Sequence, residues 1–243
     1  MMSESKETTS WRASGPYLPT LSSKTSLIEE TRQFLLTYAR LGDVEATRQA
    51  LVNGGLPQRS RATRATIIKI VQIRLTRWHP PTWVLKDLVT FAQAGHQAEL
   101  QAALLLHTAR HDVLLYNIIQ QVVVPKWTAG ERELIRANIQ RFLDDAQSIH
   151  PEIARWSHTT RERLSSHALA AMRDFGLLQG KIAKQIVEPL VPPTVVRHLV
   201  RLLQEEGIPP EQVAQHPDWQ LWLWDAARAQ KTIDASHLQE RAV

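Results

Sequence analysis

The chain has 243 residues, 43% of them hydrophobic and 22% charged, so it can bury a core and has the composition of an ordinary globular protein. It has no cysteine, which excludes disulfides, thiolate zinc sites and cysteine nucleophiles, and its formal net charge of +5 favours binding to polyanions. With only 9 glycines and abundant helix-forming residues, the sequence predicts an all-α fold.

The first 22 residues are rich in Ser, Thr and Pro and have little periodicity, which predicts a flexible leader over residues 1–22. This N-terminus has no apolar core of the kind found in signal peptides. No apolar run approaches the roughly 18 residues that a membrane span requires. We therefore expect a cytoplasmic protein with no membrane partner.

Residues 23–150 are predicted to form a first helical subdomain. Ser26 and Glu29 have the spacing of a capping box, which predicts a helix start. Asp43 is suited to cap a short second helix, and Gly54 is suited to end it. Apolar periodicity and breakers predict helices over 26–41, 44–52, 60–78, 83–93 and 97–111.

The remainder of this subdomain is predicted to hold two further helices. Asp112 can cap the first of them, which Pro125 is expected to close. Thr128 and Glu131 form a second capping box, which predicts a helix that reaches about residue 147. The His-Pro step that ends at Pro151 then predicts a boundary between subdomains.

Residues 151–243 are predicted to form a second helical subdomain that is winged-helix-like. Ser157 or Thr159 can cap its first helix, which Gly176 is expected to end. The short apolar pairs around Gln179 fit either a small β-hairpin or more helix, because the periodicity is too short to decide. Further helices are predicted over 193–206 and beyond residue 209.

The positive charge is concentrated in two blocks. Residues 46–86 hold eight basic residues and no Asp or Glu, and residues 153–201 hold eight basic and three acidic residues. Clustering of this kind is the expected electrostatic footprint of a nucleic-acid-binding surface. A solvated helix face with ordinary surface charges is the alternative for each block.

The first block has the order of a helix-turn-helix motif: a short helix, a glycine turn and a long helix. In that motif the N-terminal residues of the second helix contact bases in the major groove. Arg59, Arg61 and Arg64 occupy this leading end. The residues then predicted to contact phosphates are Lys69, Arg74, Arg77 and Lys86.

The second block is predicted to supply a secondary DNA-binding surface. Its candidate residues are Arg155, Arg161, Arg163, Lys181 and Lys184, with Arg173 nearby. A helix, a glycine and a possible wing would suit a winged-helix-like module. Glu162 and Asp174 dilute the charge here, so local ion pairs remain an equally good interpretation.

Two histidines and a tryptophan cluster are the other conspicuous features. His107 and His111 stand four residues apart, a spacing that can hold a metal, but the glutamate of an H-E-x-x-H motif is missing and a structural pair is favoured. The cluster of Trp219, Trp222 and Trp224 can stack on bases or anchor a partner protein, and core packing is the default interpretation.

No motif for catalysis is present in the sequence. There is no glycine-rich phosphate loop, no G-x-S-x-G motif and no recognisable acid/base pair. We therefore expect a protein that is not an enzyme and that needs no cofactor or metal.

Three stretches of the chain resemble the BrxA family, accessory proteins of bacteriophage-exclusion (BREX) defence systems. They are SLIEETRQFLL, NGGLPQRSRATRATIIKIVQIRL, and WSHTTRERLSSHALAAMRDFGLL with EPLVPPTVVRHL, which together span about residues 20–206. The resemblance implies an all-α fold with helix-turn-helix elements and a positive surface that binds double-stranded DNA. It also implies BREX partners, namely a methyltransferase, an ATPase and a phosphatase-like component.

The sequence thus predicts a non-catalytic, monomeric protein that binds double-stranded DNA mainly through phosphate contacts in phage defence. Sequence preference is expected to be modest, because no Asn or Gln is clearly placed to read bases. The alternative is a scaffold whose basic faces dock acidic partner proteins of the defence complex.

Overall fold

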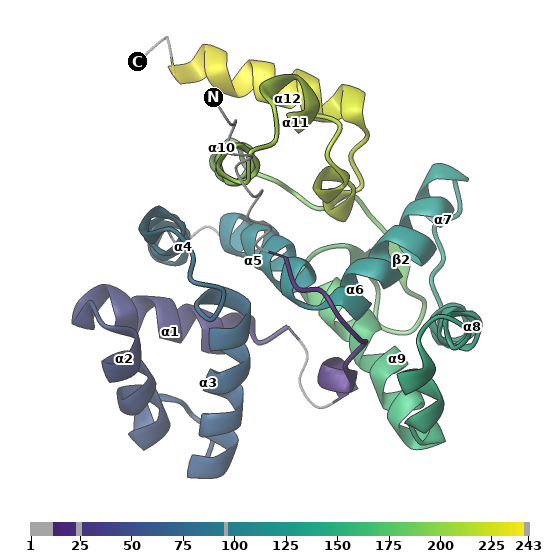
Figure 1. The fold of residues 1–243 in the computed structure, drawn as a ribbon, viewed down its shortest axis with the longest axis horizontal. Coiled ribbons are helices and arrows are strands. Elements are labelled where there is room, and N and C mark those ends of the chain that lie inside the picture. Colours follow the sequence, from purple (N-terminus) through teal and green to yellow (C-terminus); the bar gives the residue numbers. More distant parts are fainter. Residues whose placement is uncertain (1–11, 23–25, 95–96, 241–243) are drawn as a thin grey trace, which may run out of the picture.

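A computed structural model describes residues 12–22, 26–94 and 97–240 of the chain. The described part consists mainly of helices, with one short antiparallel hairpin in the C-terminal half (Figure 1). The predicted all-α fold with a small hairpin is therefore confirmed. None of the helices in these ranges is both long and apolar enough to cross a membrane.

The N-terminal helices pack around α1. The segment consists of α1 (Ile28–Leu41), α2 (Val44–Ala50), the wide turn η2 (Leu51–Gly55), α3 (Arg61–Leu75) and α4 (Thr82–Gln93). Helix α1 contacts α2, α3 and α4, and its Phe34 and Leu35 are fully buried. Asp43 caps α2 by accepting a hydrogen bond from the backbone N–H of Ala46 at 2.6 Å, as predicted.

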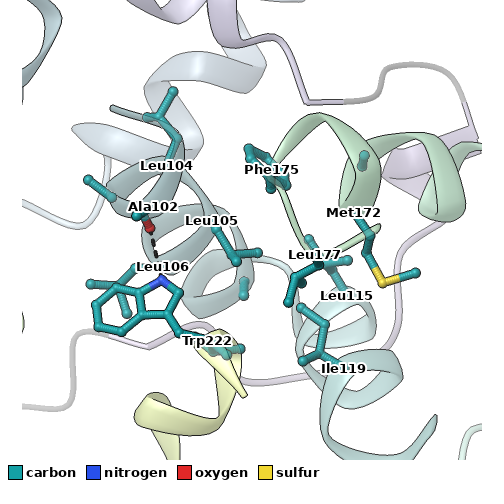
Figure 2. Close-up of a cluster of buried hydrophobic side chains, with 14 of the residues drawn as sticks. Ala102, Leu104, Leu105, Leu106, Leu115, Ile119, Met172, Phe175, Leu177 and Trp222 are labelled. Carbon is teal, nitrogen blue, oxygen red and sulfur yellow. Dashed lines mark hydrogen bonds between the residues drawn. The ribbon is translucent and has the colours of Figure 1, made fainter. Parts of the chain in front are cut away.

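The buried helix α5 (Gln97–His111) is the centre of the molecule (Figure 1). It contacts α3, α4, α6 and α10, and its leucines 104–106 are buried. Figure 2 shows Leu105 facing Leu177 and Leu115 on one side, with Trp222 on another. The indole N–H of Trp222 donates to the carbonyl oxygen of Ala102 at 3.2 Å, which satisfies its polar group inside the core.

The tryptophan cluster is part of this core, so core packing is confirmed for it. Trp219, Trp222 and Trp224 are at most 4% exposed, and their rings lie 5.7–5.9 Å apart. Trp219 donates to the carbonyl oxygen of Val213 and Trp224 to the carboxylate of Glu188. Buried rings with satisfied N–H groups are not available for stacking on bases.

The middle of the chain forms a nearly continuous helix from α6 (Val113–Ile118) through the wide turn η3 (Ile119–Val123) to α7 (Val124–Thr128). The prediction that Pro125 closes this helix is wrong. Pro125 lies inside this nearly continuous helix, which ends only at Thr128. The wider turn η3 precedes it and accommodates the ring.

The C-terminal part begins with α8 (Arg136–Ala146), η4 (Pro151–Arg155) and α9 (His158–Asp174). The hairpin strands β1 (Leu178–Gln179) and β2 (Gln185–Ile186) follow. The remaining elements are α10 (Pro193–Glu205), α11 (Pro210–Val213), η5 (Pro217–Trp222) and α12 (Ala226–Glu240).

Two predicted capping boxes are wrong because tertiary contacts replace them. The hydroxyl of Ser26 donates to the carboxylate of Asp174 at 2.7 Å, and α1 begins only at Ile28. Around Thr128 the helix ends instead of beginning, because residues 132–134 pair with β2 and are held extended. Of the two residues predicted to cap α9, Ser157 does so, because its side chain accepts a hydrogen bond from the N–H of Thr160.

The N-terminal segment packs onto the body between residues 12 and 22. Tyr17 and Leu21 are buried, and η1 (Pro19–Ser22) lies against α9. Arg12 forms an ion pair with the buried Asp218. This part of the predicted flexible leader is therefore packed, since burying each apolar side chain contributes about 1.5–3 kcal/mol. Residues 1–11 of the predicted leader lie outside the described residues.

Candidate nucleic-acid interface

The first basic surface consists of exposed cations at the start of α3, along α3 and on α4. Its members are Arg59, Arg61, Lys69, Arg77 and Lys86. Across the ranges that the structure describes, their side chains make no hydrogen bond or ion pair. Their charge is therefore not neutralised by a neighbouring carboxylate and is available to an external anion.

Two members of this surface flank the N-terminus of α3. Ser60 caps the helix through the N–H of Thr63, and Arg59 and Arg61 stand on either side of it. The unpaired backbone N–H groups of a helix start carry partial positive charge, which adds to that of the two guanidinium groups. The combination suits the phosphate oxygens of a polyanion.

Arg64, which was predicted to contact DNA together with Arg59 and Arg61, instead stabilises the turn before α3. The guanidinium of Arg64 donates to the carbonyl oxygens of Val52, Gln58 and Arg59 at 2.8, 2.5 and 3.0 Å. These bonds tie the turn before α3 to η2, because carbonyl oxygens of both segments accept from the same guanidinium group. Arg64 therefore shapes the turn that presents Arg59, and its donors face the protein.

Glycine is required at the end of η2. Gly54 has φ 144°, a conformation that other residues rarely adopt. A side chain on Gly55 would approach the side chain of Leu51 to 2.9 Å and the carbonyl oxygen of Ala50 to 3.2 Å. The glycine pair thus permits the tight path from α2 to α3.

Arg74, predicted to contact phosphates, does not lie on the surface. It is 6% exposed, and its guanidinium donates to the carbonyl oxygen of Ser26 at 2.8 Å. Burial lowers the pKa of Arg74 to about 10, and the charge of Asp112 opposes this shift. The prediction fails because position 74 falls on the packed side of α3, next to Val71 and Leu75.

The second basic surface lies on η4, α9 and the hairpin. Arg155, Arg163 and Lys181 are exposed there. Arg173 is also exposed, but it pairs with Asp174 at 2.9 Å. The charge of this surface is therefore partly neutralised within the protein.

The other two candidates of the second block are engaged by the fold. Arg161 pairs with Asp144 of α8. The ammonium of Lys184 donates to the carbonyl oxygens of Gly180 and Lys181, both at 2.8 Å. Lys184 closes the hairpin turn, whose tip carries the fully exposed Ile182.

The hairpin is joined by a third extended segment, residues 132–134. The N–H of Leu134 donates to the carbonyl oxygen of Lys184 at 3.0 Å, and Glu133 bridges Gln185. The order across this small sheet is 132–134, β2, β1, and α9 contacts both α8 and β1. In sequence the unit reads helix, extended segment, helix, helix, hairpin, which is the connectivity of a winged helix.

His107 and His111 pack against the ring of Trp78, at centroid distances of 5.9 and 5.0 Å. His107 also shares a hydrogen bond of 2.9 Å with His198, whose other ring nitrogen contacts Asp87 at 2.8 Å. Burial lowers the pKa of His107 well below its ordinary value and that of His111 to about 3. No group of three metal-ligating side chains occurs within the described ranges.

Sequence reasoning missed the residues that join distant parts of the chain. His198 and Asp87 are 111 residues apart, and the buried Arg110 pairs with Glu206 and Asp218 from the C-terminal part. The sequence shows only that polar or charged residues interrupt otherwise apolar helices at these positions. This pattern indicates a buried polar contact but does not identify the residue on the other side of it. Sequence reasoning also missed that Arg64 and Lys184 bond the backbone of their own turns, because a basic residue in a turn can equally well face an external anion.

The chain is similar to one family model and to a solved structure. A family model described as BrxA matches residues 15–202, more than half of the chain. A crystal structure of an uncharacterized protein from Magnetospirillum magneticum is similar with a TM-score of 0.64 and 16% sequence identity. The similarity covers 82% of this chain and 100% of the other, and at this identity it concerns the fold alone. The search of curated proteins found no match.

Proposed function

The chain belongs to the BrxA family, which points to a BREX-associated phage-defence protein, and from this premise we propose that it binds double-stranded DNA without catalysis. The observation that carries the proposal is the first basic surface. Five exposed cations lie there without an internal partner among the described residues, two of them at a helix N-terminus. Phosphate contacts by such cations supply most of the affinity of non-specific DNA binding.

In this proposal α2, η2 and α3 act as a helix-turn-helix element. Helix α3 contacts η2, and α1 contacts α2 and α3, so the three helices form one packed unit. The exposed side of α3 carries Thr66 and Lys69, three residues apart on one face, and Arg77 is exposed in the turn that follows the helix. Arg59 and Arg61 then contact phosphates at the leading end of the helix, and this face approaches the major groove.

The winged-helix-like unit is proposed as a secondary contact. Its α9 exposes Thr159 and Arg163 on one face, and the hairpin tip exposes Lys181. The connectivity of helices and hairpin supports this role, while the ion pairs of Arg161 and Arg173 weaken it. Most of the affinity is therefore assigned to the first basic surface.

The proposal is tested by titrating the full chain against a short DNA duplex labelled with a fluorophore, followed by anisotropy. At about 50 mM salt, where phosphate contacts are strongest, saturable binding is expected. No binding at this salt concentration would overturn the proposal. Retention of acidic partner proteins of the defence complex would then favour the scaffold function instead.

A further inference from the structure

A groove of about 470 Å³ lies between α4 and α10, with Ser236 of α12 at its edge. Small-molecule sites in proteins commonly have volumes of roughly 300–1,000 Å³. No member of the first or second basic surface lines this groove. It is therefore a separate feature, which the proposed DNA contacts do not use.

One wall of the groove carries two arginines. Arg197 and Arg201 both line it and are one helical turn apart on α10. The guanidinium of Arg201 lies 4.1 Å from the centre of the Trp83 ring, and its Nε donates to Glu205 at 3.3 Å. A guanidinium stacked on an indole is held in place, and its remaining N–H groups suit a phosphate group.

The other wall presents a fixed carboxylate. Asp87 of α4 lines the groove, and one of its oxygens contacts Nδ1 of His198 at 2.8 Å. The Nε2 atom of His198 contacts Nε2 of the fully buried His107 at 2.9 Å. This chain of hydrogen bonds orients Asp87 toward the groove.

The groove also has an apolar component between the two walls. Phe91 and Val200 line it together with the hydroxyl-bearing Thr90. A matching ligand carries an anionic group at one end and an apolar ring in the middle. At the other end it carries hydroxyl or amine donors for the carboxylate of Asp87. Nucleotides combine these three features in one molecule of suitable size.

We propose that the groove between α4 and α10 binds a nucleotide, with Arg197 and Arg201 at its phosphate and Asp87 at its hydroxyl or amine donors. Phe91 and Val200 contact the base. The proposal is independent of DNA binding by the first basic surface. It gives the protein a second, small-molecule ligand next to its central helix α5, which α10 contacts directly.

Isothermal titration calorimetry on the full chain with adenosine 5′-monophosphate, inorganic phosphate and adenosine tests this site. Adenosine 5′-monophosphate is expected to bind, and the two fragments are expected to bind at least tenfold more weakly, because each lacks the groups that fill one end of the groove. Phosphate binding as tightly as the nucleotide would contradict the role of Asp87 and the apolar floor. No heat with any of the three would overturn the proposal.

The double variant Arg197→Gln/Arg201→Gln is expected to weaken nucleotide binding by roughly a hundredfold, because it removes two charge-assisted hydrogen bonds to the phosphate. Arg40→Gln, at an exposed position on α1, is the matched control and is expected to bind as the parent does. Gln204→Glu, at an exposed position that lines the groove, adds a negative charge without disturbing the core. It is also expected to weaken nucleotide binding, so the test does not depend on the fold of the double variant.

A duplex titration of the same variants separates this site from the DNA surface. We expect Arg197→Gln/Arg201→Gln to bind the duplex as the parent does. If the parent binds no nucleotide and the double variant loses duplex affinity, the groove is an extension of the DNA surface and the nucleotide proposal is wrong. If nucleotide binds but no duplex does, the groove proposal stands and the DNA proposal fails.

Discussion

The two basic blocks hold eight basic residues each in the sequence, but the fold neutralises different shares of that positive charge. Around α3 the exposed cations have no carboxylate partner among the described residues, whereas around α9 Arg161 and Arg173 are paired with Asp144 and Asp174. A count of basic residues is therefore a poor measure of the charge that the fold leaves unpaired at the surface. What matters is the number of cations that the fold leaves exposed and unpaired.

The two regions are also alike in one respect. Each uses one basic side chain to hold the turn that presents the others. Arg64 bonds three carbonyl oxygens of the turn before α3, and Lys184 bonds two carbonyl oxygens of the hairpin turn. A basic residue in a turn can therefore act on the backbone of its own loop instead of on an external anion.

The largest expected effect is on the free energy of unfolding, and it distinguishes a buried cation of the first block from an exposed one. Replacing Arg74 by Ala should lower the free energy of unfolding by about 3–5 kcal/mol, because it removes the donor to Ser26 and leaves buried Asp112 without its cation. The matched change Lys69→Ala, at an exposed position of the same helix, should stay within about 0.5 kcal/mol. Urea denaturation measures both. Equal effects would show that Arg74 is not a structural residue.

Acid should destabilise the core. Burial lowers the pKa of His111 and of His216 to about 3, so both are neutral when folded and become protonated on unfolding below their ordinary pKa of 6.5. Stability should therefore fall as the pH is lowered from 7 to 5, by about 2 kcal/mol per histidine. Burial raises the pKa of Asp112, which offsets part of this loss.

Denaturation at the two pH values checks this expectation. His111→Gln should reduce the pH dependence, because it removes one of the histidines that are buried as neutral side chains. A free energy of unfolding that is the same at pH 7 and pH 5 would contradict the burial of these histidines as neutral side chains.

The first basic surface should dominate DNA affinity. Arg59→Gln/Arg61→Gln should weaken duplex binding by roughly tenfold to a hundredfold at fixed salt, since each arginine contributes a charge-assisted phosphate contact. The thermal midpoint should not change, because both side chains are exposed. Arg40→Gln serves as the control. A double variant that binds like the control would move the site away from α3.

The smallest expected effect concerns the second basic surface. Arg163→Gln/Lys181→Gln should weaken duplex binding by only about threefold to tenfold, because nearby carboxylates already neutralise part of this region. Anisotropy titrations at the same salt concentration compare it with the α3 variant. A larger effect than that of Arg59→Gln/Arg61→Gln would reverse the order of the two surfaces.

Local patterns were sufficient for much of the fold. The caps at Asp43 and Asp112, the long helix after the glycine turn and the burial of the tryptophan cluster follow from short-range spacing and apolar periodicity. The hairpin was one of two alternatives that the short apolar pairs around Gln179 left open. Predictions failed where a distant partner replaced a local one. Ser26 bonds Asp174 instead of capping α1, and the segment after Thr128 pairs with β2 instead of opening a helix.

The candidate site was predictable to the same extent. Arg59 and Arg61 are exposed as their place at a helix start implies. Arg74 and Arg64 were predicted to contact DNA but bond backbone carbonyl oxygens of the protein. Which side of α3 is packed, and which carbonyl groups of the turn are open, depend on tertiary contacts that the sequence does not reveal. The pairing of Arg161 with Asp144 likewise depends on how α8 and α9 pack.

The slope of duplex affinity against salt concentration tests the central claim most directly, because it counts the phosphates that the protein neutralises. The logarithm of the binding constant should fall linearly with the logarithm of salt concentration. Arg59→Gln/Arg61→Gln should reduce the steepness by about two units, roughly one for each phosphate that is no longer neutralised. Arg163→Gln/Lys181→Gln should reduce it by less. An unchanged slope in the Arg59→Gln/Arg61→Gln variant would contradict the assignment of the DNA contact to the start of α3.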